Sequence, residues 1–219
     1  MKIIGHRGAR GLAPENTIAS LQKALEHKVN EIEFDVRVTK DGIPVLHHGQ
    51  KLRDTSGNHL DLADHSFEEL KNHKPDLITL EEALETFATK VPLYIEVKRG
   101  EPAQPIAKII KKYQYSRIFV GSKNQKTLRE LHKLLPDVPK IVIEPWSGAK
   151  ATYRARALNT KLISMNQHFL WFGIIAAMKR RGYELYAYTL NDPKKAKRWA
   201  KYGLAGVVTD FPDRFVPLD

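Results

Sequence analysis

Short apolar stretches alternate with longer amphipathic stretches along the whole chain. Eight short stretches have the composition of β-strands, at Lys2–Gly5, Glu31–Thr39, Leu93–Lys98, Arg117–Gly121, Lys140–Glu144, Lys161–Met165, Glu184–Leu190 and Gly206–Thr209. The amphipathic stretches predict helices that begin near Asn16, Thr79, Pro105, Gln125, Gly148, Phe172 and Pro193. Strands that alternate with helices favour a parallel sheet.

The first helix illustrates the pattern. Its apolar residues recur at steps of three and four, which predicts one buried face formed by Ile18, Leu21, Ala24 and Leu25. Either Asn16 or Thr17 can cap its N-terminus. The helix that begins near Phe172 is expected to turn its apolar residues inward in the same way, namely Ile175, Ala176 and Met178.

The number of strand and helix repeats predicts the fold. Eight repeats within 219 residues suit an α/β fold of the TIM (β/α)8 barrel type, with residues 1–219 as a single domain. A doubly wound open sheet is the alternative, but the segment Gly5–Gly8 lacks the spacing of a dinucleotide-binding loop. The segment of approximately residues 50–76 breaks the alternation. We interpret it as a small insertion after the second strand region, formed by a loop and a short helix over one mouth of the barrel.

The amino-acid composition excludes several kinds of functional site. The chain contains no cysteine, which excludes disulfide bonds, a thiolate nucleophile and cysteine-bound zinc. No apolar run reaches the roughly 18 residues that a membrane span needs. The first eight residues contain too few apolar side chains for a signal-peptide core, so we expect a cytoplasmic location.

The chain is basic, with 36 Lys and Arg against 25 Asp and Glu, a net charge of +11. Such a charge attracts nucleic acids, anionic lipids or phosphorylated substrates. The basic residues are scattered, and the densest run, Asp192–Lys201, is expected to be the outer face of a helix. A non-catalytic, nucleic-acid-binding protein is one interpretation of the charge, although no nucleic-acid-binding motif is present.

Acidic residues on two predicted strands suggest a site for a cation. Glu33 and Asp35 alternate with the apolar residues Ile32, Phe34 and Val36, so the two carboxylates share one face of a strand. Glu96 and Lys98 share a face of the next predicted strand. In a barrel these side chains point inward, near the carboxyl ends of the strands where active sites lie. Three carboxylates favour Mg²⁺ or Ca²⁺, the alternative being a structural site neutralised by Lys or Arg.

Histidines lie at the ends of two apolar stretches. His6 ends the first predicted strand, and His47 and His48 follow the stretch 43–46. Because neighbouring side chains diverge, only one of His47 and His48 can face the site. Two histidines beside a metal could supply the acid and the base of a phosphoryl transfer.

With these residues in order, the chain resembles the glycerophosphodiester phosphodiesterase family, specifically its bacterial cytoplasmic type. The resemblance rests on short motifs in a specific order, namely His6-Arg7-Gly8, Pro14-Glu15-Asn16-Thr17, Glu33-x-Asp35, Thr39-Lys40-Asp41-Gly42 with His48, Ile95-Glu96-Val97-Lys98, Tyr188-Thr189-Leu190-Asn191 and Gly206-Val207-Val208-Thr209-Asp210. They cover nearly the whole chain.

The resemblance implies a TIM barrel that hydrolyses small-molecule glycerophosphodiesters to an alcohol and glycerol 3-phosphate. It implies metal ligands, catalytic histidines and phosphate contacts at these positions: Glu33, Asp35 and Glu96; His6 and His48; Arg7 and Lys98. It selects His48 over His47 by the distance from Gly42. No nucleic-acid partner is implied, and a membrane contact is compatible with the family but not required.

Three positions depart from the family pattern. Gly49 stands where the family usually has Asp, Asp54-Thr55-Ser56 replaces an Arg-Thr-Thr run, and Lys123 replaces a Phe. Because these departures leave the histidines and carboxylates intact, we expect an active enzyme with altered substrate choice. Phospholipase D-like hydrolysis of lysophospholipids at the same centre is an alternative. The aromatic residues of the segment 169–172 could contact an acyl chain, or could anchor the following helix.

Overall fold

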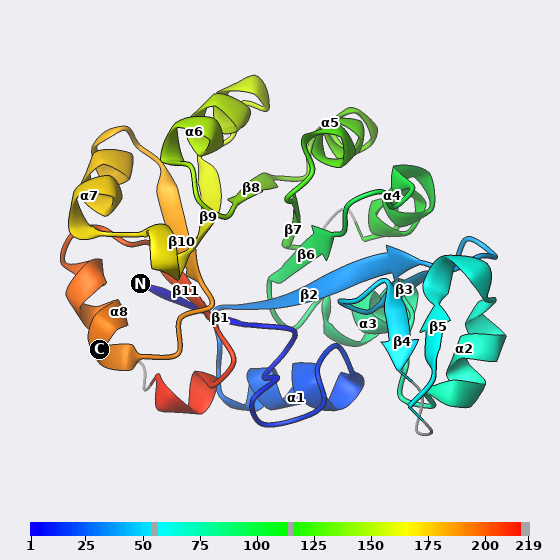
Figure 1. Cartoon of the computed structure of the whole chain (residues 1–219). Helices are drawn as coiled ribbons and strands as arrows, with labels where there is room; N and C mark the ends of the chain where they lie inside the picture. Colours follow the sequence, from blue (N-terminus) through cyan, green and yellow to red (C-terminus); the bar gives the residue numbers. More distant parts are fainter. Residues whose placement is uncertain (54–56, 114–115, 216–219) are drawn as a thin grey trace.

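Eight parallel strands form a closed barrel in the computed structural model, which describes residues 1–53, 57–113 and 116–215 (Figure 1). The strands are β1 (Lys2–Gly5), β2 (Glu31–Val38), β6 (Leu93–Val97), β7 (Ile118–Ser122), β8 (Lys140–Glu144), β9 (Leu162–Asn166), β10 (Glu184–Tyr188) and β11 (Gly206–Thr209). Strand β1 pairs with both β11 and β2, which closes the sheet. The predicted TIM barrel is confirmed, and the open doubly wound sheet is wrong.

Helices surround the barrel at the predicted places. They are α1 (Ile18–Glu26), α3 (Leu80–Phe87), α4 (Ala103–Lys111), α5 (Gln125–Leu134), α6 (Gly148–Ala157), α7 (Phe172–Arg180) and α8 (Pro193–Ala200). A short 3-10 turn, η3 (Pro212–Arg214), follows β11 where an eighth helix would stand. The basic run predicted as an outer helical face lies in α8, with only Ala196 and Trp199 of that helix buried.

Some predicted details differ at helix and strand ends. Thr17, not Asn16, caps α1, because the Thr17 hydroxyl accepts a hydrogen bond from the Ser20 amide. Ile18 is the first residue of α1 and is 37% exposed. Leu21 and Ala24, in the following turns, are fully buried. Ala176 of α7 is half-buried rather than inward. The strand predicted to reach Leu190 ends at Tyr188.

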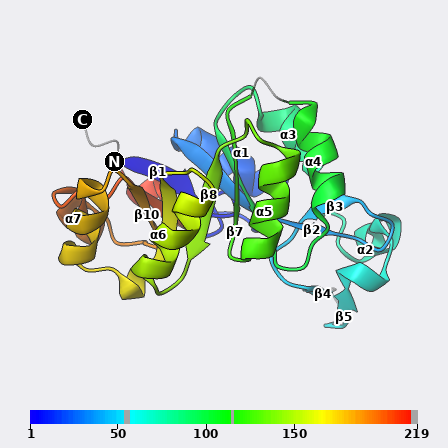
Figure 2. The same ribbon diagram turned by 90° about the horizontal axis from the view of Figure 1, so that it is seen from above.

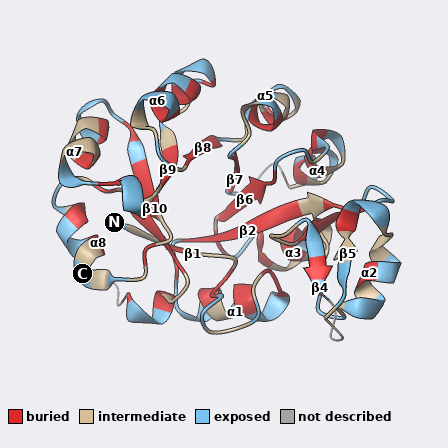
Figure 3. Cartoon of the chain, in the orientation of Figure 1, coloured by how far each residue is buried: buried red, intermediate tan, exposed pale blue. Residues whose placement is uncertain are grey.

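Two apolar layers hold the barrel together. The barrel interior is filled by Ile4, Tyr94, Ile141, Ile143, Tyr186 and Val208. The alternate strand residues point outward and pack against the helices in two larger clusters, one containing Ile32, Phe34 and Val36 (Figure 3). The strand interiors are buried on both faces, as expected for a parallel sheet. This packing gives the carboxyl ends of the strands a fixed geometry.

The segment between β2 and α3 contains more regular structure than the sequence predicts. Its elements are β3 (Pro44–Leu46), antiparallel to β2, the hairpin β4 (Lys51–Arg53) and β5 (His59–Asp61), the 3-10 turn η1 (Leu62–Asp64) and α2 (Phe67–His73). The three-residue strands were missed because they are too short for an alternation pattern. A small core formed by Val45, Leu52, Leu62, Leu70 and Leu77 holds the segment. The hairpin projects from the barrel on the same side as the turn η2 (Gln167–Phe169) (Figure 2).

Across the described ranges, every helix is too short or too polar to cross a bilayer.

Candidate active site

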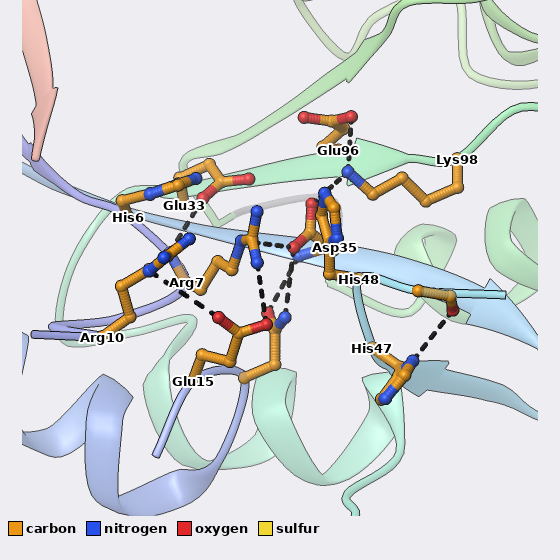
Figure 4. A network of polar contacts seen from close by, with 12 residues as sticks. His6, Arg7, Arg10, Glu15, Glu33, Asp35, His47, His48, Glu96 and Lys98 are labelled. Atoms are coloured by element: carbon orange, nitrogen blue, oxygen red, sulfur yellow. Dashed lines mark hydrogen bonds and ion pairs between the residues drawn. The ribbon is translucent and has the colours of Figure 1, made fainter. Parts of the chain in front are cut away.

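A cavity of about 280 Å³ opens at the carboxyl ends of the barrel strands. The seven residues predicted from the sequence all line it, namely His6, Arg7, Glu33, Asp35, His48, Glu96 and Lys98. They come from the ends of β1, β2 and β6 and from the segment after β3 (Figure 4). The fold therefore brings together residues that lie far apart in the sequence.

Three buried carboxylates form the centre of the cavity. Glu33 and Asp35 point inward from β2, and Glu96 pairs with Asp35 across the parallel ladder between β2 and β6. One oxygen from each of the three carboxylates lies within 4.8 Å of the others. Burial, and the negative charge of Asp35 and Glu96, raise the pKa of Glu33 well above its ordinary value. A group of buried oxygen donors with mutual repulsion has the chemistry of a divalent-cation site.

Two cationic side chains reach the same carboxylates. Lys98 Nζ lies 2.5 Å from Asp35 Oδ1 and 2.6 Å from Glu96 Oε1, and Arg7 Nε lies 3.1 Å from Asp35 Oδ2. Burial opposes ionisation of Asp35, but the charges of Lys98 and Arg7 outweigh burial and lower the pKa of this carboxyl. Arg7 and Lys98 thus stand beside the cation site, where an anionic substrate would also find them.

Asn16 supports Asp35, a contact that the sequence interpretation did not predict. Its side-chain amide donates to Asp35 Oδ2 at 3.1 Å, and its carbonyl accepts from the Asp35 backbone amide at 3.1 Å. Asn16 has a φ of 58°, a left-handed conformation that Asn tolerates better than most residues. The segment Pro14–Thr17 is one of the motifs that carry the family resemblance, but its local sequence does not indicate that Asn16 contacts Asp35.

His6 is oriented by a carboxylate from the last strand region. Its Nδ1 lies 2.6 Å from Asp210 Oδ1, and the Asn191 side-chain amide donates to Asp210 Oδ2 at 2.9 Å. The carboxylate accepts the Nδ1 proton, which leaves Nε2 of His6 for another partner. Burial opposes ionisation of Asp210, but the hydrogen bonds from His6 and Asn191 lower the pKa of its carboxyl. Asp210 belongs to a motif noticed in the sequence, but its contact with His6 depends on barrel closure.

His48 is held in a different way. Its backbone carbonyl accepts a hydrogen bond from Arg37 Nε at 3.0 Å, and Arg37 Nη1 lies 2.7 Å from Glu101 Oε1. Burial, together with the charges of Lys98 and Arg7, lowers the pKa of His48 to about 4, although Asp35 acts in the opposite direction. His48 is therefore neutral at pH 7.

His47 does not line this cavity. Its ring Nδ1 donates to the backbone carbonyl of Gly49 at 2.9 Å, and burial lowers the pKa of the imidazole. Gly49 itself has no left-handed φ, so the backbone does not require glycine at this position. A Cβ atom on Gly49 would lie 3.1 Å from the Lys51 carbonyl and 3.7 Å from the Lys51 amide.

The other two departures from the family pattern have different positions. Lys123 lines the cavity together with Arg7, Arg10 and Lys98. Its Nζ lies 3.6 Å from Glu96 Oε1 and 5.5 Å from the ring centre of Tyr188. The segment 54–56 lies outside the described residues.

The aromatic segment after β9 contains both buried and exposed side chains. Leu170 is buried in the outer core, whereas Phe169, Trp171 and Phe172 are 49%, 58% and 59% exposed. Their neighbour His168 lines the cavity. The segment thus anchors α7 through Leu170 and leaves three aromatic side chains exposed in the residues that follow His168.

Comparison with known proteins agrees with this geometry. A family model described as "Glycerophosphoryl diester phosphodiesterase family" matches residues 6–214. A glycerophosphodiester phosphodiesterase of Caldanaerobacter subterraneus is 30% identical, over 99% of this chain and 96% of that protein. A phosphodiesterase of Oleispira antarctica, solved with the product sn-glycerol-3-phosphate, is 26% identical with a TM-score of 0.87, over 98% of this chain and 94% of that one. The glycerophosphodiester phosphodiesterase of Thermotoga maritima shares the fold, with a TM-score of 0.84 at 23% identity, over 100% of this chain and 98% of that one. The chain therefore belongs to the glycerophosphoryl diester phosphodiesterase family, whose members are hydrolases of glycerophosphodiesters.

Proposed function

We propose that the chain hydrolyses glycerophosphodiesters to an alcohol and glycerol 3-phosphate, with a divalent cation and a pair of histidines. The observation that carries the proposal is the grouping of the carboxylates of Glu33, Asp35 and Glu96 in one cavity with His6 and His48. When Mg²⁺ or Ca²⁺ is bound by these carboxylates, it offsets charge on the phosphoryl group. The hydrolysis product found in the Oleispira antarctica structure is consistent with this substrate class.

The cationic side chains position the phosphoryl group. Arg7 and Lys98 offer charge-assisted hydrogen bonds to its oxygens, and Arg10 and Lys123 add further positive charge. Ion pairs with Asp35 and Glu96 hold Arg7 and Lys98 at the cavity, and a cation bound to the carboxylates would release them for the substrate.

The two histidines divide the proton transfers. One histidine accepts the proton of the nucleophile, which is water or the neighbouring glycerol hydroxyl, and the other protonates the leaving oxygen of the alcohol. His6 lies on a different side of the carboxylates from His48, and with Asp210 on Nδ1 it presents Nε2 to the substrate (Figure 4). The protein thus takes up one proton and releases one in each turnover.

A substrate panel tests the proposal. Glycerophosphocholine, glycerophosphoethanolamine, glycerophosphoinositol and a lysophospholipid would be incubated with Mg²⁺, with Ca²⁺ or with a chelator. The measured products would be glycerol 3-phosphate from the glycerophosphodiesters and lysophosphatidic acid from the lysophospholipid. We expect turnover of at least one glycerophosphodiester with a cation and none with the chelator. Full activity in the chelator would contradict the metal role.

Hydrolysis of lysophospholipids is the second candidate. The observation that favours it is the exposure of Phe169, Trp171 and Phe172, which follow the cavity-lining His168 in the sequence and on which an acyl chain would bury apolar surface. In the same panel, preference for the lysophospholipid that disappears in Trp171→Ala would support this candidate.

The domain organisation, location and partners that we propose are those that the family resemblance implies. We propose that residues 1–219 act as one domain on a small-molecule substrate in the cytoplasm, with no nucleic-acid partner and no required membrane contact. A non-catalytic nucleic-acid-binding protein is set aside because the chain belongs to a family of enzymes. The +11 charge then serves an anionic substrate.

A further inference from the structure

A second cavity lies beside the first, and His48 lines both. Its volume is about 580 Å³, compared with about 280 Å³ for the first. Glu15 and Asn16 line one part of it, and residues between Lys51 and Asp76 line another. The ion pair of 2.7 Å between Arg7 of the first cavity and Glu15 of the second links the two walls.

Among the described residues that line it, the second cavity has an excess of positive charge. In β4, Leu52 is fully buried in the core of the 44–77 segment, so Lys51 and Arg53 on either side of it face the opposite way and line the cavity. Neither cation has an ion-pair partner among the described residues.

The two described acidic residues that line the cavity do not neutralise this charge. Glu15 lies 2.7 Å from Arg7 Nη1, and Asp76 lies 2.6 Å from Lys74 Nζ. Both carboxylates are therefore already paired with other cations, and the charges of Lys51 and Arg53 remain for a ligand.

A phosphodiester has two arms, and the two cavities provide space for both. With the phosphoryl group beside the carboxylates, an arm that passes His48 enters the second, larger cavity. We propose that this cavity is the subsite for the alcohol arm, and that it selects alcohols that carry a further phosphate group. This inference rests on the proposed function. Lys51 and Arg53 attract a second phosphate and repel a quaternary ammonium group such as choline.

Steady-state kinetics on matched substrates test the selectivity. Glycerophosphoinositol 4-phosphate and glycerophosphoinositol differ only by the added phosphate, so the ratio of their kcat/KM values reports the subsite. We expect the wild-type ratio to favour the phosphorylated substrate and to shrink as NaCl is raised. The double variant Lys51→Gln/Arg53→Gln should lower the ratio about fivefold to tenfold, mainly through KM, because each exposed charge contributes a few-fold.

A matched control removes the same charge elsewhere. Lys108 and Lys111 are exposed in the last turn of α4, outside both cavities, so Lys108→Gln/Lys111→Gln should leave the ratio unchanged. Equal wild-type turnover of the two substrates, or the same loss of ratio in both double variants, would overturn the proposal.

Binding of the alcohol product separates this proposal from the proposed function. Titration of the wild type with inositol 4-phosphate measures the second cavity without turnover. We expect binding that weakens in Lys51→Gln/Arg53→Gln and not in the control. No turnover of any diester with intact binding would contradict the proposed function alone. Turnover of the diesters with no binding of inositol 4-phosphate would contradict the subsite alone. If both measurements fail, both proposals are wrong.

Discussion

The two sides of the active site are built differently. On one side, His6 is fixed through its ring by Asp210, and Asp210 is fixed in turn by Asn191. On the other side, His48 is held through its backbone carbonyl by Arg37, beside a segment with its own small core. The His6 side is assembled from barrel strands, whereas the His48 side borders the 580 Å³ cavity. The comparison indicates that the first side serves the common chemistry and the second also serves substrate choice.

The largest expected effect comes from the carboxylates between the two sides. Replacing Glu33, Asp35 or Glu96 with Ala should lower kcat/KM by at least about two orders of magnitude. Each is a proposed ligand of the cation, whose charge would stabilise the transition state. The folded state should survive in Glu33→Ala, because burial and the charges of Asp35 and Glu96 disfavour the ionised form of Glu33. Asp35→Ala should be less stable, since it leaves Lys98 and Arg7 without this ion-pair partner. Kinetics with added Mg²⁺ or Ca²⁺, together with circular dichroism, measure both quantities. Wild-type rates in any of the three variants would show that the cation site lies elsewhere.

Loss of either histidine should have the next largest effect. We expect His6→Ala and His48→Ala each to lower kcat/KM about a hundredfold, the scale of general acid–base catalysis. His47→Ala is the matched control and should be mild, because His47 lies outside the catalytic cavity.

The pH profile gives a second measurement of the same pair. It should be bell-shaped, with its acid limb below the usual histidine range, since the pKa of His48 is lowered to about 4. A silent His48→Ala with an inactive His47→Ala would reverse the assignment.

Asp210→Asn should have an intermediate effect, confined to the His6 side. Without the carboxylate, His6 loses its fixed tautomer, and we expect kcat to fall about tenfold. The variant also changes stability with pH. The pKa of Asp210 is lower in the folded than in the unfolded chain, so its ionised form stabilises the fold above about pH 4 and this contribution is lost as pH falls further. The free energy of unfolding, from urea titrations at pH 3 and pH 7, should therefore depend less on pH in the variant. An unchanged kcat would show that Asp210 does not orient the imidazole.

Gly49→Asp should have the smallest effect, on the His48 side. An Asp carboxylate here can accept a hydrogen bond from the Lys51 amide, which would hold the loop, while the crowding against the Lys51 carbonyl shifts it slightly. We expect a few-fold redistribution of kcat/KM among the substrates of the panel. Activity that appears only in the variant would mean that the natural protein has lost catalysis. A uniform change across all substrates would place this residue in the shared chemistry instead.

The sequence predicted the barrel well because its strands and helices carry local signals. Runs such as Glu31–Val38 alternate inward carboxylates with outward apolar side chains, and the same alternation located the cation site. Other parts depend on contacts between distant residues. The contact between Asp210 and His6 requires β1 to pair with β11. The hydrogen bond from Arg37 to the His48 carbonyl requires β3 to pair with β2. Neither contact leaves a periodic pattern in the sequence.

The contact between His6 and Asp210 joins residues 204 positions apart. During synthesis, His6 therefore leaves the ribosome 204 residues before Asp210. A chain that stops after β10 would contain all three carboxylates and both histidines, yet it would lack the Asp210 carboxylate that binds Nδ1 of His6. Closure of the barrel by β11 and orientation of the imidazole are therefore one event. We therefore expect a chain that lacks β11 to leave His6 without its orienting carboxylate, even though it contains every proposed cation ligand.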